Sequence, residues 1–488
     1  MDYSKYITAT AIPEAASMIE TFRAIGYSLE TAVADIIDNS ISANAKNIFI
    51  RRYWRGSKSI ITIIDDGKGM NSEEIIIAMR PGSQNPFSDR LETDLGRFGL
   101  GLKTASFSQC RKLSLMSKRR GESTSFWSWD LDYVIQSNKW ELLQWMPEEF
   151  LSDLDDWSSG TVVIWSDLDR VIPPQTAETD EKAKRKFSFA LDKVKNHIAM
   201  TFHRFIEDKS IKIFWGEHAI EAWNPFCPDE SKTQEQPTDY ITGDVKMKGY
   251  VLPHKNNFSS EQAYKKAEGI HGYPAQQGFY VYRGKRLLLA GDWLGMFRKE
   301  EHYKLVRIQI DLPNKLDTEW QIDIKKSKAY PPVICREQLE SYAKSVRAIG
   351  SDVYRHRGKI LRERAGQSFQ PLWLEKKKDN MWSFVVNREH LIIKSFINFA
   401  REKPEQAIEK LLKFIEEAIP TKTIYINEAQ GEETQKTPFS DISDQFISEV
   451  LMLMYNNQIS SGKTPEQAKA MLKILEPFNN YEDLIDKL

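Results

Sequence analysis

Two aspartates and an asparagine share one side of a segment that is otherwise apolar. In the stretch ETAVADIIDNSISANAK, residues 30–46, the polar positions i, i+3, i+4 and i+7 are Asp35, Asp38, Asn39 and Ser42. On an α-helix these positions fall on one face, although Asp and Asn are poor residues for a helix interior. A solvated surface would explain the row by itself. Facing a cleft, its oxygens could accept protons or bind a hard cation.

A second polar cluster ends the apolar run before it. In IIDDGKGM the predicted strand stops at Asp65 and Asp66, and a turn with Gly67 and Gly69 follows. Glycines at such a turn let another molecule approach the backbone closely. Taken alone, this is an ordinary turn.

A third element is the glycine-rich stretch GRFGLGLKTA, with Gly96, Gly99 and Gly101 leading into a predicted helix. Unpaired N–H groups at such a turn can gather around phosphates. Alone, this signal is also weak.

In this order and spacing, the three elements resemble the GHKL ATPase superfamily of gyrase, the ninety-kilodalton heat-shock chaperones, histidine kinases and MutL. A fourth stretch, SSGTVVIW at residues 158–165, resembles the last nucleotide motif of that superfamily. The likeness covers residues 20–170. It implies ATP as the nucleotide, Mg²⁺ as its cofactor and a Bergerat-type α/β sandwich as the fold.

The resemblance also implies which residues contact adenine. Asp65 would accept the exocyclic amine of the base, and Gly67, Gly69 and Met70 would form the wall against it. Thr161 would reach the same side of the base through its hydroxyl or a bridging water.

The phosphate end is implied in the same way. Asn39 would bind Mg²⁺, whose other ligands are the nucleotide phosphates and water. Backbone amides would wrap the phosphates, and a lysine would add a cation near them. These residues are Gly96, Gly99, Gly101, Leu102 and Lys103.

One position departs from the superfamily pattern. Four residues before the magnesium asparagine, most of these ATPases carry a glutamate that activates the attacking water, and here the residue is Asp35. An aspartate can do this proton transfer only if the water lies closer or a second water relays the proton. We therefore expect an ATPase, but the sequence does not determine its rate of hydrolysis. Asp38 is expected to be a structural or supporting group.

The region after the first domain resembles a transducer domain, which returns a lysine to the γ-phosphate. The stretches GFYVYRGKRLLL and WQIDIKKSKAYPP are similar to those of MORC and prokaryotic MORC-like ATPases. If the last stretch is a strand with Ile322 and Ile324 facing inward, Lys326 lies on the same side. Lys326 is our first candidate and Lys328 the second, with a solvated basic strand end as the alternative.

The predicted fold class is α+β/α/β multidomain. We expect a GHKL ATP-binding domain with an N-terminal strap (1–168), a ribosomal S5-like transducer domain (169–333), a basic helix and linker (334–390) and a helical interaction domain (391–488). Strands are expected in the first domain at 47–54 and 59–67, followed by four more up to residue 168, one of them at 139–145. The stretch SIKIFW is assigned to the second domain.

Composition limits the classes of protein. The chain has 488 residues, of which 41% are hydrophobic, and it balances 68 basic against 69 acidic residues. It therefore has cores to bury, and any basic surface must be local. Three widely spaced cysteines fit a reducing compartment, and no signal or membrane-spanning pattern is present. We expect a cytoplasmic protein without a membrane partner.

Beyond Pro332 the sequence predicts helices. The first, from about 334 to 365, has a positive excess that suggests a phosphate backbone, or acidic neighbours of its own chain. The terminal helices, with an apolar stripe that includes Ile408 and Leu412, indicate an assembly or partner-binding module.

Our first functional hypothesis is an ATP-gated dimeric clamp that acts on DNA or with a nuclease partner, as the likeness to prokaryotic MORC-like proteins of anti-phage defence implies. In it, ATP orders the loop around residues 80–95 and closes the N-terminal regions of two protomers. The alternatives are a nucleotide-sensing adaptor with little turnover, which Asp35 favours, and a chaperone-like ATPase. A histidine kinase is disfavoured because no histidine precedes His197.

Overall fold

The computed structural model describes most of the chain up to residue 355 and parts of the remainder. The described residues are 5–6, 9, 11–82, 101–241, 245–313, 316, 319–323, 329–355, 372–378, 381–390, 393–394, 404–421, 423–424, 434–435, 443–473 and 481–488. The chain divides into two compact units, Met1–Tyr354 and Arg355–Leu488. Each unit is described by itself.

A mixed seven-stranded sheet forms the first half of the first unit. Its order is β4-β3-β5-β2-β1-β6-β7, with β1 and β6 parallel and the other neighbours antiparallel. The predicted hairpin of β1 and β2 is confirmed, with Ile48 opposite Asp65. The strands are β1 (Asn47–Tyr53), β2 (Ile60–Asp65), β3 (Lys112–Lys118), β4 (Ser125–Asp130), β5 (Gly160–Ser166), β6 (Lys212–Trp215) and β7 (His218–Ala219).

Two expectations about this sheet are wrong. The stretch SIKIFW supplies β6, which pairs with β1, so the sheet extends past residue 168 and takes a strand that we assigned to the second domain. The stretch at 139–145 forms no strand, and only an isolated bridge joins Ser128 to Leu143. Local β propensity did not decide either case, because pairing partners lie far away in sequence.

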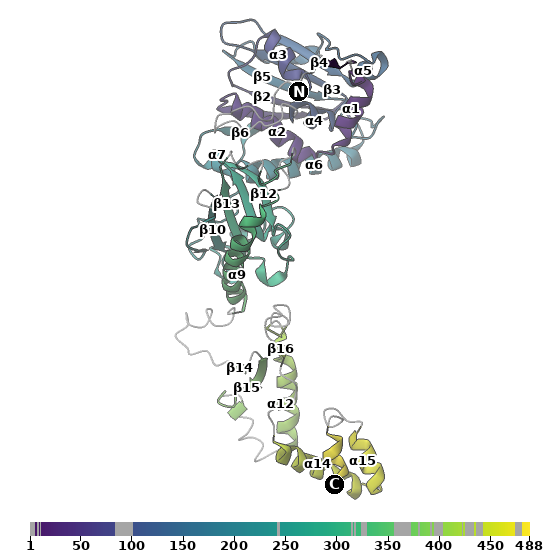
Figure 1. Cartoon of the computed structure of the whole chain (residues 1–488), viewed down its shortest axis with the longest axis vertical. Coiled ribbons are helices and arrows are strands. Elements are labelled where there is room, and N and C mark those ends of the chain that lie inside the picture. Colours follow the sequence, from purple (N-terminus) through teal and green to yellow (C-terminus); the bar gives the residue numbers. More distant parts are fainter. Residues whose placement is uncertain are drawn as a thin grey trace. The chain divides into compact units, whose positions relative to one another are not determined.

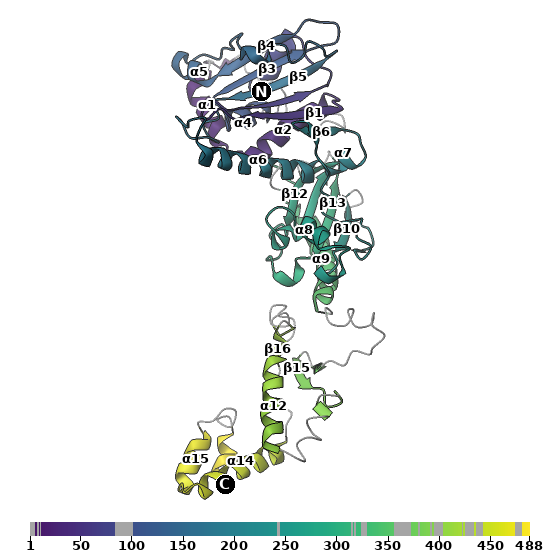
Figure 2. The same cartoon turned by 180° about the vertical axis from the view of Figure 1, so that it is seen from behind.

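Helices cover one face of this sheet. They are α1 (Ala15–Ala24), α2 (Leu29–Ser42), α3 (Ser72–Met79), α4 (Gly101–Phe107), α5 (Leu131–Ser137), α6 (Glu181–Thr201) and α7 (His203–Glu207). Figures 1 and 2 show α6 between the first sheet and strand β12. Helix α2 begins at Ser28, whose Oγ accepts a hydrogen bond from the Thr31 amide, as an N-cap residue does.

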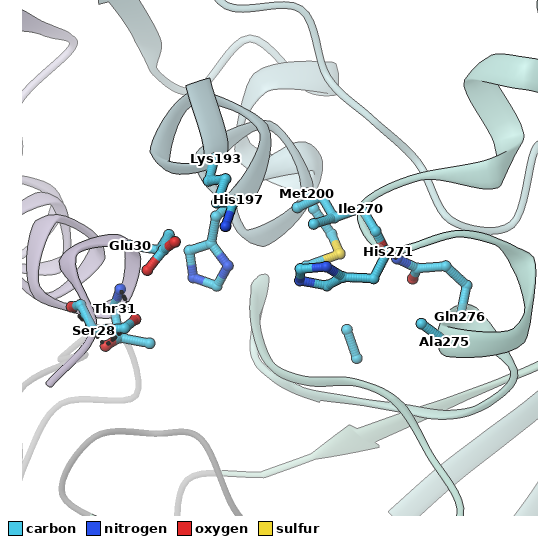
Figure 3. A pocket seen from close by; sticks show the side chains of 11 residues that line it. Ser28, Glu30, Thr31, Lys193, His197, Met200, Ile270, His271, Ala275 and Gln276 are labelled. Atoms are coloured by element: carbon cyan, nitrogen blue, oxygen red, sulfur yellow. Dashed lines mark hydrogen bonds between the residues drawn. The ribbon is translucent and has the colours of Figure 1, made fainter. Parts of the chain in front are cut away.

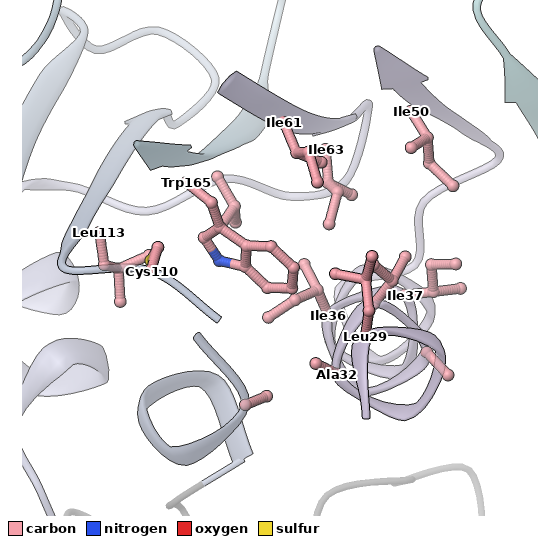
Figure 4. Close-up of a cluster of buried hydrophobic side chains, with 14 of the residues drawn as sticks. Leu29, Ala32, Ile36, Ile37, Ile50, Ile61, Ile63, Cys110, Leu113 and Trp165 are labelled. Atoms are coloured by element: carbon pink, nitrogen blue, oxygen red, sulfur yellow. The ribbon is translucent and has the colours of Figure 1, made fainter. Parts of the chain in front are cut away.

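The main core lies between α2 and the sheet. Ile36 and Ile37 of α2 and Trp165 of β5 are all at most 1% exposed, and Figure 4 shows them in one cluster. Since α4 and α6 also pack on α2, the helix is buried nearly all round. A solvated surface therefore does not explain Asp35 and Asp38, which are 3% and 1% exposed, whereas Asn39 and Ser42 are exposed.

A six-stranded mixed sheet forms the second half of the unit. Its order is β12-β11-β13-β10-β8, with β9 on β10 and with β11 parallel to β13. The strands are β8 (Gln234–Glu235), β9 (Asp239–Ile241), β10 (Val245–Val251), β11 (Gly278–Arg283), β12 (Arg286–Asp292) and β13 (Val306–Leu312). Short helices α8 (Glu261–Glu268), η4 (Tyr273–Gln276) and η5 (Glu301–Tyr303) lie among them.

Helix α9 (Val333–Arg355) belongs to this second core. Leu339, Ala343 and Val346 are at most 1% exposed and pack in the same cluster as Ile308 of β13. Its basic side is also engaged: the Arg347 guanidinium lies 3.9 Å from the ring of Tyr303 and 3.6 Å from a carboxylate oxygen of Glu300. These contacts favour the interpretation that this part of the helix packs on its own chain.

The second unit contains a small sheet and further helices. Strands β14 (Trp373–Lys378) and β15 (Met381–Val386) pair, and β16 (Thr434–Gln435) joins β15. The helices are α12 (Pro404–Glu417), α14 (Asp444–Ser460), α15 (Pro465–Lys473) and α16 (Glu482–Asp486). Among the described helices, none is long and apolar enough to cross a membrane.

Candidate active site

Asp65 is the last residue of strand β2, and its carboxylate lies next to α2. Ser40 donates its hydroxyl to Oδ2 of Asp65 over 2.8 Å, and the Gly67 amide donates to Oδ1 over 2.9 Å. Asp65 is 5% exposed. Burial raises the pKa of its carboxyl to about 6, against the two hydrogen bonds, which lower it. A carboxylate held in this way is a directed acceptor for a donor from a ligand.

Thr161 and Ser117 continue the same row across the sheet. Thr161 lies opposite Asp65 on one side and opposite Ser117 on the other, so the three side chains share one face. The hydroxyls of Thr161 and Ser117 are 2.9 Å apart, and the Met70 amide donates to Ser117 over 2.9 Å. Met70, Thr161 and Asp65 are thus brought together.

Both glycines after Asp65 occupy places where a side chain does not fit. Gly69 has φ +66°, and a Cβ there would lie 1.9 Å from the carbonyl oxygen of Lys118. A Cβ on Gly67 would lie 2.8 Å from Oδ1 of Asp65 and 2.9 Å from Cβ of Ala43. The turn packs against α2 and β3 because it carries no side chains at these two positions.

Asp35 faces the start of α4. Tyr27 donates its hydroxyl to Oδ2 of Asp35 over 3.0 Å, and a Cβ on Gly101 would lie 3.6 Å from the same oxygen. Burial first, and then the charge of Asp35, raise the pKa of the Tyr27 phenol above its usual value. Tyr27 therefore stays protonated and orients the carboxylate.

Asn39 and Asp66 differ in what they can offer a ligand. Asn39 is exposed on α2, one turn after Asp35. Asp66 accepts from the amides of Lys46 and Asn47 over 2.6 and 2.8 Å, so it is engaged in holding the chain between α2 and β1. Asn39 is thus the more exposed of the two, since Asp66 is partly buried and both of its oxygens accept hydrogen bonds.

The glycine-rich stretch is only partly described. Gly96 and Gly99 lie outside the described residues, while Gly101 and Leu102 begin α4. Lys103 is 2% exposed, and its Nζ donates to the carbonyl of Ala78 over 2.9 Å at the end of α3. Burial lowers the pKa of Lys103 to about 8. In this structure the ammonium is thus directed at α3.

Asp38 connects α2 to the second sheet. Its Oδ1 lies 3.2 Å from Nε of Arg286, the first residue of β12. The Arg286 guanidinium also donates to the carbonyl of Leu287 and lies 5.4 Å from the ring centroid of Phe202. The pair is buried, which fits the expected supporting role of Asp38. The element that Asp38 contacts is strand β12.

The segment expected to return a lysine is described only up to its start. Lys326 and Lys328 lie outside the described residues. Ile322 is buried as expected, whereas Ile324 lies outside the described residues. Residues 319–321 form a turn, so the predicted strand is wrong there. The charge of Asp323 contributes to the raised pKa of Tyr27.

Four residues of the site escaped the sequence analysis: Tyr27, Ser40, Ser117 and Arg286. The inward position of Ser117 could have been predicted, because it follows Leu113 and Leu115 at alternating positions of one strand. In the structure Ser117 is 0% exposed. Arg286 opens the apolar run RLLL, which is an unusual place for a cation. Nothing in the local sequence marks Tyr27 or Ser40.

Comparison with known proteins identifies the first domain. Residues 27–161 match the family described as histidine kinase-, DNA gyrase B-, and HSP90-like ATPase. This segment contains α2, the Asp65 turn and Thr161, and the match confirms the resemblance drawn from the motifs.

Similar curated proteins cover the same part of the chain. ATPase morc-1 of Caenorhabditis elegans is 32% identical over 95 residues, which are 20% of this chain and 11% of that protein. DNA mismatch repair protein MutL of Dictyoglomus thermophilum is 26% identical over 160 residues, which are 31% of this chain and 24% of that protein. The matches thus span a quarter or less of these relatives' lengths.

Among solved structures, the ATPase and transducer domains of DNA topoisomerase II from Balamuthia mandrillaris align with 69% of this chain and 86% of that one. The sequence identity is 9% and the TM-score is 0.38. At this level the alignment does not assign the fold of the second sheet.

Proposed function

We propose that this chain, a GHKL-superfamily protein through its residues 27–161, binds ATP with Mg²⁺ and hydrolyses it. The observation that carries the proposal is that α2 is hydrogen-bonded or packed against every described nucleotide motif. Ser40 holds Asp65, and Asp35 meets Gly101. Motifs that are separate in sequence are thereby arranged around one helix.

The adenine end would be read by Asp65. The exocyclic amine is a donor, and Asp65 offers carboxylate lone pairs that Ser40 and Gly67 orient. Thr161, beside it, would add a hydroxyl or a water-mediated contact. Gly67, Gly69 and Met70 would lie against the base, since the turn that they form is held to β3 by Ser117.

The donor set fits Mg²⁺ bound mainly by the nucleotide. Among the described residues, no group of three or more His, Cys, Asp or Glu side chains could hold a metal ion. Asn39 provides one exposed amide oxygen on α2, and Mg²⁺ accepts one or two protein ligands with phosphates and water as the rest. When bound, the ion would neutralise charge on the phosphates.

Asp35 would accept a proton from the attacking water. Tyr27 fixes the position of one of its oxygens, and Gly101 at the start of α4 adds no side chain next to that oxygen. Because aspartate is one methylene shorter than glutamate, the water must come closer or act through a second water. We therefore propose slow turnover.

The second domain would complete the site. Lys326 and Lys328 follow Asp323 by three and five positions, and the charge of Asp323 contributes to the raised pKa of Tyr27. One of these two lysines would reach the γ-phosphate. The phosphate-wrapping role of Gly96, Gly99, Gly101 and Leu102 remains part of the proposal. Lys103 would have to leave the Ala78 carbonyl to join them.

The larger function we propose is an ATP-gated dimeric clamp acting on DNA, with a nuclease or other defence protein as a possible partner. The mismatch-repair relatives support DNA as the target, although they are matched over only a small part of their length. Closure would follow ordering of the loop around residues 80–95 by ATP.

A nucleotide-sensing adaptor is the second candidate, and the observation that favours it is Asp35 in place of glutamate. A chaperone-like ATPase is the third. Calorimetric titration of the full chain with Mg²⁺ and a non-hydrolysable ATP analogue tests nucleotide binding, and light scattering of the same samples tests the clamp. Binding with a doubled mass is expected, whereas an unchanged monomer mass contradicts the clamp.

Phosphate release then separates enzyme from adaptor. For an ATPase, turnover disappears in Asp35→Asn while analogue binding persists, because only proton transfer is lost. An adaptor binds ATP without turnover that depends on Asp35. Failure of the wild-type chain to bind the analogue contradicts the proposal as a whole.

A further inference from the structure

One buried ion pair joins the nucleotide helix to the second domain. Oδ1 of Asp38 lies 3.2 Å from Nε of Arg286, and the two side chains are 1% and 4% exposed. Arg286 is further held by the carbonyl of Leu287 and by the ring of Phe202. The two residues are 248 positions apart in the chain, so only the docking of the two domains brings them together.

Such a pair is a poor choice if stability is the only requirement. Two charges taken out of water cost several kcal/mol each, and apolar side chains of similar volume often serve as well or better. What a buried pair does add is geometry, because removing either partner leaves an uncompensated charge. The pair therefore fixes the position of α2 relative to β12, and it adds little to the free energy of unfolding.

The position of Asp38 on α2 links the placement of β12 to Asp35 and Asn39. It lies three residues after Asp35 and one before Asn39, all within the helix Leu29–Ser42. Because α2 is a continuous helix, a shift or rotation that follows Asp38 also moves Asp35 and Asn39. The acceptor for the attacking water and the magnesium ligand are thus on the element that Arg286 holds.

A pocket interrupts the packing between α2 and the second domain. A cavity of about 270 Å³ lies between α2, α6 and the second domain, lined by side chains that include Glu30, His197 and His271. Figure 3 shows these side chains converging from the two domains. The lining residues Glu30 of α2 and Ala290 of β12 come from the two elements that the pair joins. Away from α2 the junction is packed, since Met200 of α6 shares one apolar cluster with Tyr282 of β11 and Leu287 of β12.

A neighbouring pair makes a natural comparison. Lys285, one residue before Arg286, contacts Asp208, which follows α7. The Lys285 side chain is 49% exposed, and its partner is not on α2. The same turn between β11 and β12 therefore carries one buried link to the nucleotide helix and one exposed link elsewhere.

We infer that Arg286 is a positioning residue that couples the placement of the second domain to the nucleotide site through Asp38 and α2. The inference rests on the proposed binding of ATP. It predicts that nucleotide bound at α2 slows amide hydrogen exchange in β12, and that this response needs the Asp38–Arg286 pair. Lys285 does not take part in it.

Amide hydrogen exchange of the full chain, with and without Mg²⁺ and a non-hydrolysable ATP analogue, tests this. In the wild type the analogue slows exchange in both α2 and β12. In Arg286→Met the slowing persists in α2 and is lost in β12, while Lys285→Met behaves as the wild type. Turnover of Arg286→Met falls about 10-fold or more with less than about 3-fold change in affinity, since a misplaced group costs rate rather than binding.

A double variant separates positioning from folding. Asp38→Asn with Arg286→Met leaves no orphan charge, so its thermal midpoint should recover relative to Arg286→Met alone. Its β12 response and turnover should stay low, because the link is absent. Recovery of the response in the double variant would show that the pair is merely structural.

The remaining outcomes are also decisive. If the wild type binds the analogue but β12 does not respond, or responds equally in Arg286→Met, the inference is overturned and the proposed function stands. If calorimetry on the same samples detects no binding by the wild type, the proposed function fails and the inference with it. A loss in Lys285→Met equal to that in Arg286→Met would assign the effect to general loosening of the interface.

Discussion

Tyr27 donates its hydroxyl to Oδ2 of Asp35 over 3.0 Å, from just ahead of the helix that carries the carboxylate. Tyr27 is 7% exposed and Asp35 is 3% exposed, so water competes little for this bond. One carboxylate oxygen is thereby directed, and the phenol remains protonated because its pKa is raised. The same oxygen faces the start of α4, where a Cβ on Gly101 would lie 3.6 Å from it.

Replacing Tyr27 should impair turnover more than binding. In Tyr27→Phe the carboxylate loses a charge-assisted hydrogen bond, and turnover should fall about 10-fold while affinity for the analogue changes little. Phosphate release and calorimetry measure the two effects. Tyr133→Phe is the control, since that hydroxyl donates to Glu141 on the exposed surface. Equal losses in both variants would contradict an orienting role for Tyr27.

Protonation of Asp65 should weaken ATP binding. Its pKa is about 6 in the free protein, and a protonated carboxyl offers a poorer acceptor to the adenine amine. Affinity should therefore be level above pH 7 and fall about tenfold per pH unit below 6. Calorimetry across this range checks the profile. Asp65→Asn should bind weakly and show no such dependence.

The same residue should make the folded state less stable at high pH. The pKa of Asp65 rises from 3.8 to about 6 on folding, so folding favours the protonated form. Its contribution to the free energy of unfolding is thus present below pH 3.8 and is lost as pH rises through 6, by at most about 3 kcal/mol.

Asp65→Asn removes this titration. Its thermal midpoint should exceed that of the wild type at pH 8, and the difference should shrink toward pH 4. Thermal denaturation in matched buffers measures both values. A difference that does not change with pH would argue against a buried, titrating carboxyl at this position.

A side chain at Gly69 should disrupt the turn against adenine. Gly69 and Gly121 both have positive φ, +66° and +82°, but only at Gly69 does a Cβ meet backbone, 1.9 Å from the Lys118 oxygen. Gly121→Ala should cost about 1 kcal/mol of backbone strain. Gly69→Ala should cost at least about 2 kcal/mol more and weaken analogue binding. Comparable midpoints for the two variants would contradict the steric argument.

Arg347 should act in stability rather than in DNA binding. Its guanidinium lies 4.0 and 3.9 Å from the rings of Phe297 and Tyr303 and pairs with Glu300. Arg347→Met should lower the free energy of unfolding by about 1–2 kcal/mol and leave the salt dependence of DNA binding unchanged. The control is Lys344→Met. The Lys344 side chain is 61% exposed, so this variant should leave the free energy of unfolding nearly unchanged. A change in the salt slope for Arg347→Met would point to phosphate contact.

Much of the first domain could be predicted because its signals are local. The β-rich runs NIFIRRYW and SIITIIDDG predict two strands, and the turn between them is short enough to pair them. The strand β6 was assigned to the wrong domain because its partner β1 lies about 160 residues earlier, and parallel pairing leaves no local mark. The expected strand at 139–145 failed for a related reason: propensity does not ensure a partner.

The site divides in a similar way. Asp35, Asn39, Asp65 and Thr161 were named from the resemblance of their motifs to the GHKL superfamily. The structure places Asp35 and Asn39 on α2, and Asp65 opposite Thr161 across the sheet. The direction of Lys103 toward Ala78 was not foreseeable, because side-chain direction depends on the packing of α3 and α4. Lys326 and Lys328 remain predictions, as do the phosphate contacts of Gly96 and Gly99.

The sequence by itself determined that a GHKL-type nucleotide domain is present, since ordered short motifs carry that information within each element. Only the tertiary structure decided that Asp35 and Asp38 are buried, that Ser117 and Tyr27 support the site, and that Arg286 reaches α2 from another domain. Burial and partners depend on which surfaces meet after folding. Those contacts join residues up to 248 positions apart, a distance over which local periodicity carries no information.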